Sequence, residues 1–241
     1  MNAGPTIRRQ LGRLSSAFNR VKELDKLTDN HIPSFVLPDD SKPRKGFLDI
    51  KGFQKVHDAL PSHWQTTVKF LYFTGCRFGA AKKIAWEMIS KDCSEIELPA
   101  DIVKNNEPLT LPLVGPLEGI AVALRSQRKT FPKPSERVFC FRNFRVLWNT
   151  ACDTLGLGIF DKKTGHYKGL SPHDFRRIAA RNLIKAGVSG RDAMKITGHE
   201  TEHVFERCNV KTTEDTREAL ITVGQLSPAT VTPIAEKSST R

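Results

Sequence analysis

Residues 170–177, with the sequence LSPHDFRR, combine the side chains best suited to chemistry on a phosphate. Pro172 favours a helix start, which places His173 and Arg176 one turn apart. An imidazole beside a guanidinium suits a phosphodiester, because arginine presents two planar donors to phosphate oxygens while histidine donates a hydrogen bond or moves a proton. The spacing alone is a weak signal, since such pairs are ordinary on basic helices.

Three other motifs could contribute to the same anion site. Residues 74–79 (TGCRFG) end an apolar helix and place Arg77 at the start of the next one, where a helix N-terminus favours anions. Lys104 lies in the turn of a predicted hairpin, and residues 196–199 (ITGH) place His199 just beyond a helix-ending glycine. Each residue alone would usually be a surface or capping residue, so only their combination indicates a site.

Taken in chain order, these residues resemble the active-site series of the tyrosine recombinases, the family of phage and transposon integrases. The series is Arg77, Lys104, His173, Arg176 and His199. The resemblance runs from about residue 47 to residue 226. It implies a mainly α fold with a small antiparallel β-sheet (α+β), that of the DNA breaking-rejoining enzymes.

The resemblance also implies a reaction. In the family, a tyrosine attacks a DNA phosphodiester, forms a 3′-phosphotyrosyl link and frees a 5′-hydroxyl, without a metal or other cofactor. By this likeness, Arg77 and Arg176 hold the non-bridging oxygens and stabilise the charged transition state. His173 and His199 donate hydrogen bonds or handle the nucleophile's proton, and Lys104 protonates the departing 5′-oxygen.

The sequence departs from the family at the nucleophile. Cys208 stands nine residues after His199, where the family carries its tyrosine, and the two tyrosines present are Tyr72, in an apolar helix, and Tyr167, before the His173 helix. A thiolate attacks well but lacks the reach of a phenol, and its phosphate adduct would partition differently between religation and hydrolysis. A deliberate inactivating substitution, a decayed integrase and a DNA-binding relative that no longer cuts all stay open.

A second departure concerns the first arginine. Ala80 stands where many relatives carry an acidic residue that orients this arginine. We therefore expect Arg77 to be held less firmly than in those relatives.

Residues 199–203 (HETEH) match the His-Glu-x-x-His pattern of zinc metalloproteases, in which two histidines on one helical face bind the metal. That site needs a continuous helix and a third ligand, whereas Gly198 directly precedes His199 and charged residues surround His203. We keep zinc proteolysis as a remote alternative and expect no metal and no other cofactor. Stoichiometric zinc would distinguish the two classes.

Hydrophobic periodicity predicts a mainly helical chain with one short hairpin. An amphipathic helix over residues 8–28 stands apart, and the hairpin strands are residues 95–98 and 109–113. The other predicted helices span residues 51–59, 62–73, 77–87, 115–128, 141–155, 173–187, 190–197 and 214–223.

The composition along the chain suggests four parts. Residues 31–46 are rich in proline and charge and read as a linker. By the family resemblance, residues 1–30 are the C-terminal helix remnant of a core-binding (SAM-like) DNA-binding domain, and residues 47–226 are the catalytic domain. Residues 227–241, with their Ser, Thr and Pro content, are expected to form a disordered tail.

The charge balance favours a polyanionic partner, since 38 Lys and Arg against 26 Asp and Glu give a net charge of +12. Double-stranded DNA at recombination (attachment) sites is the first candidate. Five scattered cysteines indicate reduced thiols, and the chain lacks both an apolar stretch of membrane-spanning length and a signal-peptide block, so we expect no membrane association. The expected location is cytoplasmic, in a bacterium and near its nucleoid. Further basic residues that could contact the DNA backbone are Lys82, Lys83, Arg177, Arg181 and Arg207.

We therefore predict a site-specific recombinase of a phage or other mobile genetic element, active in DNA recombination and integration. It would assemble on DNA as a homo-oligomer of up to four copies, and its cleavage would be impaired by Cys208. The alternative is a non-catalytic DNA-binding regulator derived from an integrase. Cys208 favours this alternative, while retention of the five other family residues argues against it.

Overall fold

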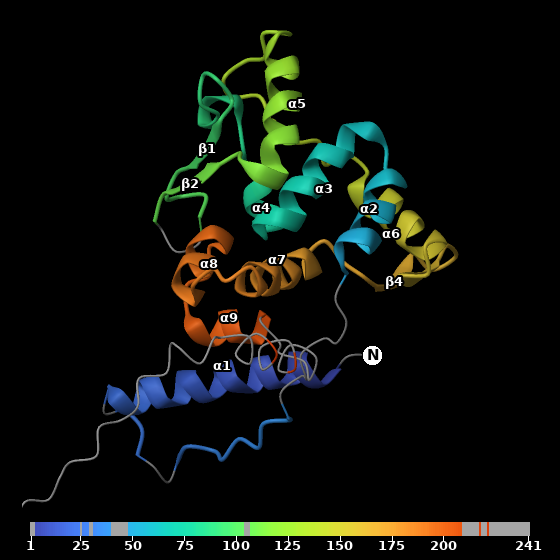
Figure 1. The fold of residues 1–241 in the computed structure, drawn as a ribbon. Coiled ribbons are helices and arrows are strands. Elements are labelled where there is room, and N and C mark those ends of the chain that lie inside the picture. The colour runs from blue at the N-terminus through green and yellow to red at the C-terminus, as the bar shows by residue number, and fades with distance from the viewer. Residues whose placement is uncertain are drawn as a thin grey trace, which may run out of the picture. The chain divides into compact units, whose positions relative to one another are not determined.

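The computed structural model describes residues 3–24, 26–28, 31–39, 48–103 and 107–208, together with positions 217 and 221 (Figure 1). The chain divides into two compact units, Met1–Gly46 and Phe47–Arg241. Among the described residues, no helix combines the length and apolar character needed to cross a membrane.

The first unit is built on helix α1, Ala3–Glu23. The helix predicted over residues 8–28 therefore exists, but it begins and ends about five residues earlier than predicted. Within this unit the rings of Phe18 and Phe35 lie 5.7 Å apart, and Arg8 donates a hydrogen bond to the carbonyl of Pro38. These contacts hold the segment after the helix against it.

The second unit is mostly helical, as the sequence predicts. Short 3-10 turns at Trp86–Met88 and Gly115–Leu117 accompany the helices. The helices are α2 (Ile50–Asp58), α3 (Ser62–Thr74), α4 (Phe78–Ala81), α5 (Glu118–Arg128), α6 (Phe144–Thr154), α7 (Asp174–Lys185), α8 (Gly190–Thr197) and α9 (Glu202–Cys208). The helix predicted over residues 214–223 lies almost entirely outside the described residues.

The single helix predicted over residues 77–87 is wrong. Helix α4 ends at Ala81, and the chain then becomes extended, with Ala85 bridged to Arg137. Ile84 and Ala85 are buried, and the Ile84 carbonyl accepts from the amide of Val138 at 3.0 Å. The apolar spacing fits a helix, but burial against a distant segment stabilises the extended form instead.

The described residues form two hairpins rather than the single one predicted. Strand β1 (Glu95–Leu98) pairs antiparallel with β2 (Leu109–Pro112), close to the predicted hairpin. The second hairpin joins β3 (Gly158–Asp161) to β4 (His166–Gly169), also antiparallel. The sequence gives no clear sign of this second hairpin, because its short strands have no clear apolar alternation.

The core of the second unit lies between α3 and α7. Tyr72 on α3 stacks on Phe53 with ring centroids 4.0 Å apart and meets Phe175 of α7 edge-on at 5.4 Å. Its hydroxyl donates to the Leu48 carbonyl at 3.2 Å. Tyr72 is therefore a core residue, as its apolar surroundings in the sequence predict.

Gly75 fixes how α3 meets its neighbours. It adopts a left-handed conformation with φ 63° and caps α3 by donating its amide to the Leu71 carbonyl. A Cβ atom here would lie 2.9 Å from the Cβ of Ala179 and 3.1 Å from the Cγ2 of Thr197. Only glycine at this position allows the end of α3 to lie so close to α7 and α8.

We expect Gly75→Ala to lower the free energy of unfolding by about 2 kcal/mol, because it combines left-handed strain with a steric clash. Gly79→Ala is the matched control, since Gly79 lies in α4 with open space around its Cα. The control should change stability by less than about 1 kcal/mol. Urea unfolding measures both, and equal losses would contradict this account.

Candidate active site

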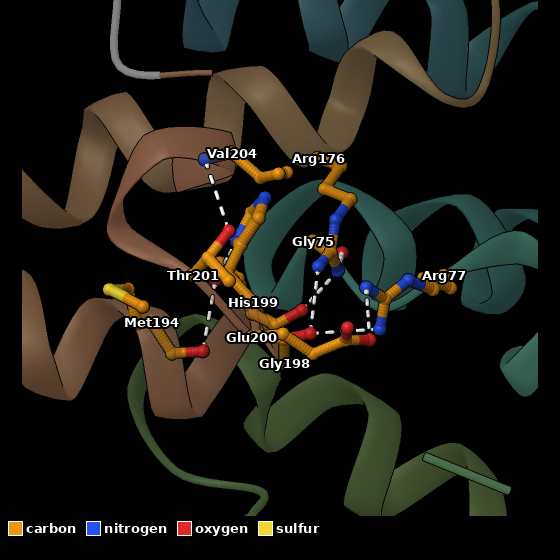
Figure 2. A network of polar contacts seen from close by, with 10 residues as sticks. Gly75, Arg77, Arg176, Met194, Gly198, His199, Glu200, Thr201 and Val204 are labelled. Carbon is orange, nitrogen blue, oxygen red and sulfur yellow. Dashed lines mark hydrogen bonds and ion pairs between the residues drawn. The ribbon is translucent and has the colours of Figure 1, made fainter. Parts of the chain in front are cut away.

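Three helix ends meet and bring together three of the predicted site residues (Figure 2). Arg77 lies between α3 and α4, at the N-terminal boundary of α4. Arg176 is in the first turn of α7, and His199 follows the left-handed Gly198 that ends α8. The sequence motifs thus predict the local position of each residue correctly.

One backbone carbonyl holds both arginines. The Gly198 oxygen accepts from Nη1 of Arg77 at 2.8 Å and from Nη2 of Arg176 at 2.9 Å. A helix C-terminus leaves its last carbonyls unsatisfied and carries partial negative charge, which suits a cation. The end of α8 therefore positions two guanidinium groups side by side.

Arg176 is almost completely buried, with 4% of its surface exposed. It also donates to the carbonyl of Gly75, at 2.9 Å, and to that of Thr197. Burial, and then the nearby Arg77 charge, lower the pKa of Arg176 to about 10, so it stays protonated at neutral pH. The carbonyls from the ends of α3 and α8 offset the cost of burying this charge.

His199 is also buried, with 4% of its surface exposed. Its Nδ1 lies 2.6 Å from the Oγ1 of Thr197, and that hydroxyl donates to the Ala193 carbonyl at 2.7 Å. Because the hydroxyl proton is used there, Nδ1 carries the ring proton and Nε2 keeps its lone pair. Nε2 is buried and has no hydrogen-bond partner among the described residues.

The charge state of His199 follows from its surroundings. Burial first, and then the charges of Arg176 and Arg77, lower the pKa of its imidazole to about 3. At neutral pH the ring is therefore uncharged, and Nε2 acts as a hydrogen-bond acceptor.

Of the two remaining residues of the family series, His173 and Lys104, only His173 lies among the described residues. His173 is exposed at the start of α7. Lys104 lies outside the described residues, but Val103, the residue before it, lines a small cavity together with Arg77 and Gly198. Val103 therefore lies beside Arg77 and the end of α8.

The basic residues predicted to contact DNA differ in exposure. Arg177 is buried and pairs with Asp174 at 3.1 Å, so its charge stabilises the start of α7. Arg181 is half-buried. The exposed members of the set are Lys82, Lys83 and Arg207.

Neither cysteine near the arginines is a preformed thiolate. Cys208, at the end of α9, is half-buried, and burial raises the pKa of its thiol although Arg176 and Arg177 oppose that change. Cys76 is buried beside Arg77, and burial raises its pKa to about 12. Both thiols are therefore protonated at neutral pH.

Tyr167 is occupied elsewhere in the fold. Its hydroxyl donates to the Leu170 carbonyl at 2.9 Å, and burial raises the pKa of the phenol. Its ring lies against Gly158, so it packs the second hairpin.

The zinc-protease pattern does not form its required helix. Helix α9 begins at Glu202 and contains His203, whereas His199 lies before it with Nδ1 engaged by Thr197. Across the described residues there is no group of three or more His, Cys, Asp or Glu side chains that could hold a metal ion.

Two further contributors to the site are not apparent from the sequence motifs. The first is the Gly198 carbonyl, which no side-chain motif reveals. The second is Glu200, whose Oε1 lies 3.6 Å from Nη2 of Arg77. Its position next to His199 was the available signal, but only the folded chain brings this carboxylate to Arg77.

The lowered pKa of His199 predicts a loss of stability in acid. As pH falls below about 6.5, an unfolded histidine gains a proton that the buried ring does not accept until pH is near 3. Titration of His199 therefore leaves the free energy of unfolding unchanged above about pH 7, and lowers it as pH falls from about 6.5 toward 3. From about pH 7.5 to about pH 5.5, the native chain should lose roughly 1 kcal/mol more stability than His199→Gln. Equal losses in urea unfolding would show that the ring titrates normally.

Comparison with known proteins identifies the fold. Similar solved structures include XerA recombinase (13% identity, 91% of this chain and 76% of that chain, TM-score 0.58). A lambda integrase dimer bound to a COC′ core site is similar at 17% identity over 86% of this chain, 58% of that chain and a TM-score of 0.59. The Tn1549 transposon integrase in complex with transposon right end DNA matches at 16% identity over 91% of this chain, 79% of that chain and a TM-score of 0.63. At these identities the likeness establishes the predicted fold class.

The sequence comparisons give the family. No curated protein matches the chain. The model described as "Phage integrase family" matches residues 49–207, which is well over half of the sequence. The chain therefore belongs to the phage integrase family, the tyrosine recombinases.

Proposed function

We propose that this chain, as a member of a site-specific recombinase family, binds duplex DNA and positions a scissile phosphodiester at Arg77 and Arg176 for strand cleavage and religation. The observation that carries the proposal is the shared Gly198 carbonyl, 2.8 and 2.9 Å from the two guanidinium groups. Two cations held side by side in a partly buried site are suited to bind a dianionic phosphorane.

The two arginines have different parts in this proposal. The side chain of Arg77 is 27% exposed and can contact a phosphate that arrives from solvent. Arg176 lies buried and supplies positive charge in an environment of low dielectric. Because carbonyls already hold both groups, little reorganisation is needed when charge develops on the phosphate.

The cleavage step follows from this arrangement and the family resemblance. A nucleophile on the protein bonds to phosphorus while the bond from phosphorus to the 5′-oxygen breaks. The nucleophile loses its proton and the departing oxygen gains one, a transfer that we assign to His173 and Lys104. His199, neutral with an accepting Nε2, hydrogen-bonds the nucleophile's proton.

The residue at the expected nucleophile position, Cys208, is poorly suited to attack a phosphodiester. The match to the family model ends at residue 207, one position before Cys208. A half-buried thiol that burial keeps protonated is a poor nucleophile toward a phosphodiester. We infer that the chain binds and orients DNA but cleaves it inefficiently, which also supports the second candidate, a non-cleaving DNA-binding regulator.

Assembly and domain roles complete the proposal. Solved relatives include a lambda integrase dimer on a core site and a tetramer bound to a Holliday junction. By analogy, copies of this chain would assemble on attachment-site DNA, up to a tetramer. Residues 1–30 would be the end of a core-binding domain, residues 31–46 a linker and residues 47–226 the catalytic domain. The protein would then act in the cytoplasm, on bacterial or phage DNA.

Cys208→Tyr should create covalent protein–DNA adducts that the native chain forms slowly or not at all. The assay uses nicked suicide duplexes carrying a site recovered by selection from random DNA, resolved on denaturing gels. Adducts with Cys208→Tyr alone would establish an intact site lacking its nucleophile. If both proteins bind the site and neither reacts, the regulator is favoured and the proposed catalytic roles fail.

Glu200→Gln should lower the cleavage rate of the Cys208→Tyr protein by roughly tenfold to a hundredfold, because Arg77 loses the carboxylate that orients it. Ala80→Glu offers a rescue, since residue 80 is one helical turn from Arg77 and lines the same small cavity. Part of the rate should return in the double variant. An unchanged rate in Glu200→Gln would remove Glu200 from the site.

A further inference from the structure

We infer that the β3–β4 hairpin is a second DNA-backbone contact, which grips phosphates flanking the cleavage site. The inference rests on the proposed function, because it requires that the chain bind duplex DNA. It concerns residues 158–169, none of which the motifs singled out for binding.

The hairpin carries a concentration of uncompensated positive charge. Lys162, Lys163 and Lys168 are all exposed. Across the described residues, none of the three makes an ion pair within 4.0 Å of a carboxylate. Lysine is a compact charge that suits phosphate oxygens, so three free ammonium groups on one hairpin favour a polyanion.

The one acidic residue on the hairpin is used internally. The carboxylate of Asp161 accepts from the amide of Lys163 at 2.9 Å and from the hydroxyl of Thr164 at 2.7 Å. These hydrogen bonds lower the pKa of Asp161 and close the turn. The turn is therefore ordered, and its lysines project from a defined backbone.

The base of the hairpin is anchored to the catalytic unit. On one side the amide of Phe160 donates to Asp153 of α6 at 3.1 Å. On the other, the Leu170 carbonyl accepts from both Trp148 Nε1 and the hydroxyl of Tyr167, each at 2.9 Å. Figure 1 shows β4 beside α6. The hairpin that carries the lysines is thus hydrogen-bonded to α6 of the same unit.

The hairpin is also close to the active site along the chain. Only three residues separate Gly169, the end of β4, from His173, so the Cα atoms of the two lie at most about 14 Å apart. That reach is comparable to the roughly 12 Å width of the DNA major groove. Phosphates near a phosphodiester held at Arg77 and Arg176 would therefore fall within range of the base of the hairpin, where Lys168 lies next to Gly169.

The test compares two charge-matched triple variants. One carries Lys162→Ala, Lys163→Ala and Lys168→Ala. The control carries Lys91→Ala, Lys129→Ala and Lys133→Ala, all exposed: Lys129 caps α5, the Lys91 carbonyl accepts from Arg128 of α5, and Lys133 follows α5 in the chain. Figure 1 shows that this end of α5 points away from α7. Both variants lose the same formal charge, so any difference between them reflects position.

The measurement is the dependence of log Kd on log salt concentration, by fluorescence anisotropy with the selected duplex. Each lost phosphate contact reduces the slope by about 0.9, so the hairpin variant should lose about 2 to 3 and the control less than about 1. Replacing the same three hairpin lysines by arginine should retain the native slope, which separates lost charge from lost folding.

The outcomes separate this inference from the proposed function. If the native chain binds DNA and both alanine variants have equal slopes, the hairpin inference is overturned and the proposed function stands. If the native chain shows no salt-dependent binding to duplex DNA, both are overturned. A selective loss in the hairpin variant supports the second contact.

Discussion

The carbonyl oxygen of Gly198 accepts hydrogen bonds from two guanidinium groups, and the arrangement of the site depends on that shared acceptor. Arg77 and Arg176 repel each other, which contributes to the lowered pKa of Arg176. The oxygen between them, at the negative end of α8, offsets that repulsion. The left-handed turn at Gly198 and the packing of α8 on α7 therefore also position the two cations.

The same positive charge determines the state of the histidine. A protonated His199 would add a third cation to a buried cluster, and both burial and the arginines lower its pKa. The positive charge of the site therefore resides on the two guanidinium groups, while the imidazole of His199 stays neutral. A bound phosphate would relieve the repulsion between the arginines, so DNA binding and stability of the site should be thermodynamically linked.

The surroundings of Cys208 affect the pKa of its thiol in two opposite directions. The arginines favour a thiolate, whereas packing beside Phe205 in a small apolar cluster disfavours it, and burial has the larger effect. The proposed phosphate-binding arginines are thus held side by side, while Cys208, at the proposed nucleophile position, is kept in its protonated form. The two candidate functions, recombinase and DNA-binding regulator, therefore differ in the residue required at position 208 and share the rest of the site.

Local patterns in the sequence were sufficient for the helical fold class, for the β1–β2 hairpin and for the motifs that carry Arg77, Arg176 and His199. These features depend on residues near each other in the chain, such as glycine caps and apolar periodicity. The tertiary structure alone decided that Ala85 and Ile89 are extended and bridged to other segments, that Arg177 is buried on Asp174 and that Glu200 reaches Arg77. It also decided that the Gly198 carbonyl accepts hydrogen bonds from both Arg77 and Arg176, which are 99 positions apart in the chain. The physical reason is that burial and backbone hydrogen bonding between distant segments leave no periodic trace in either segment.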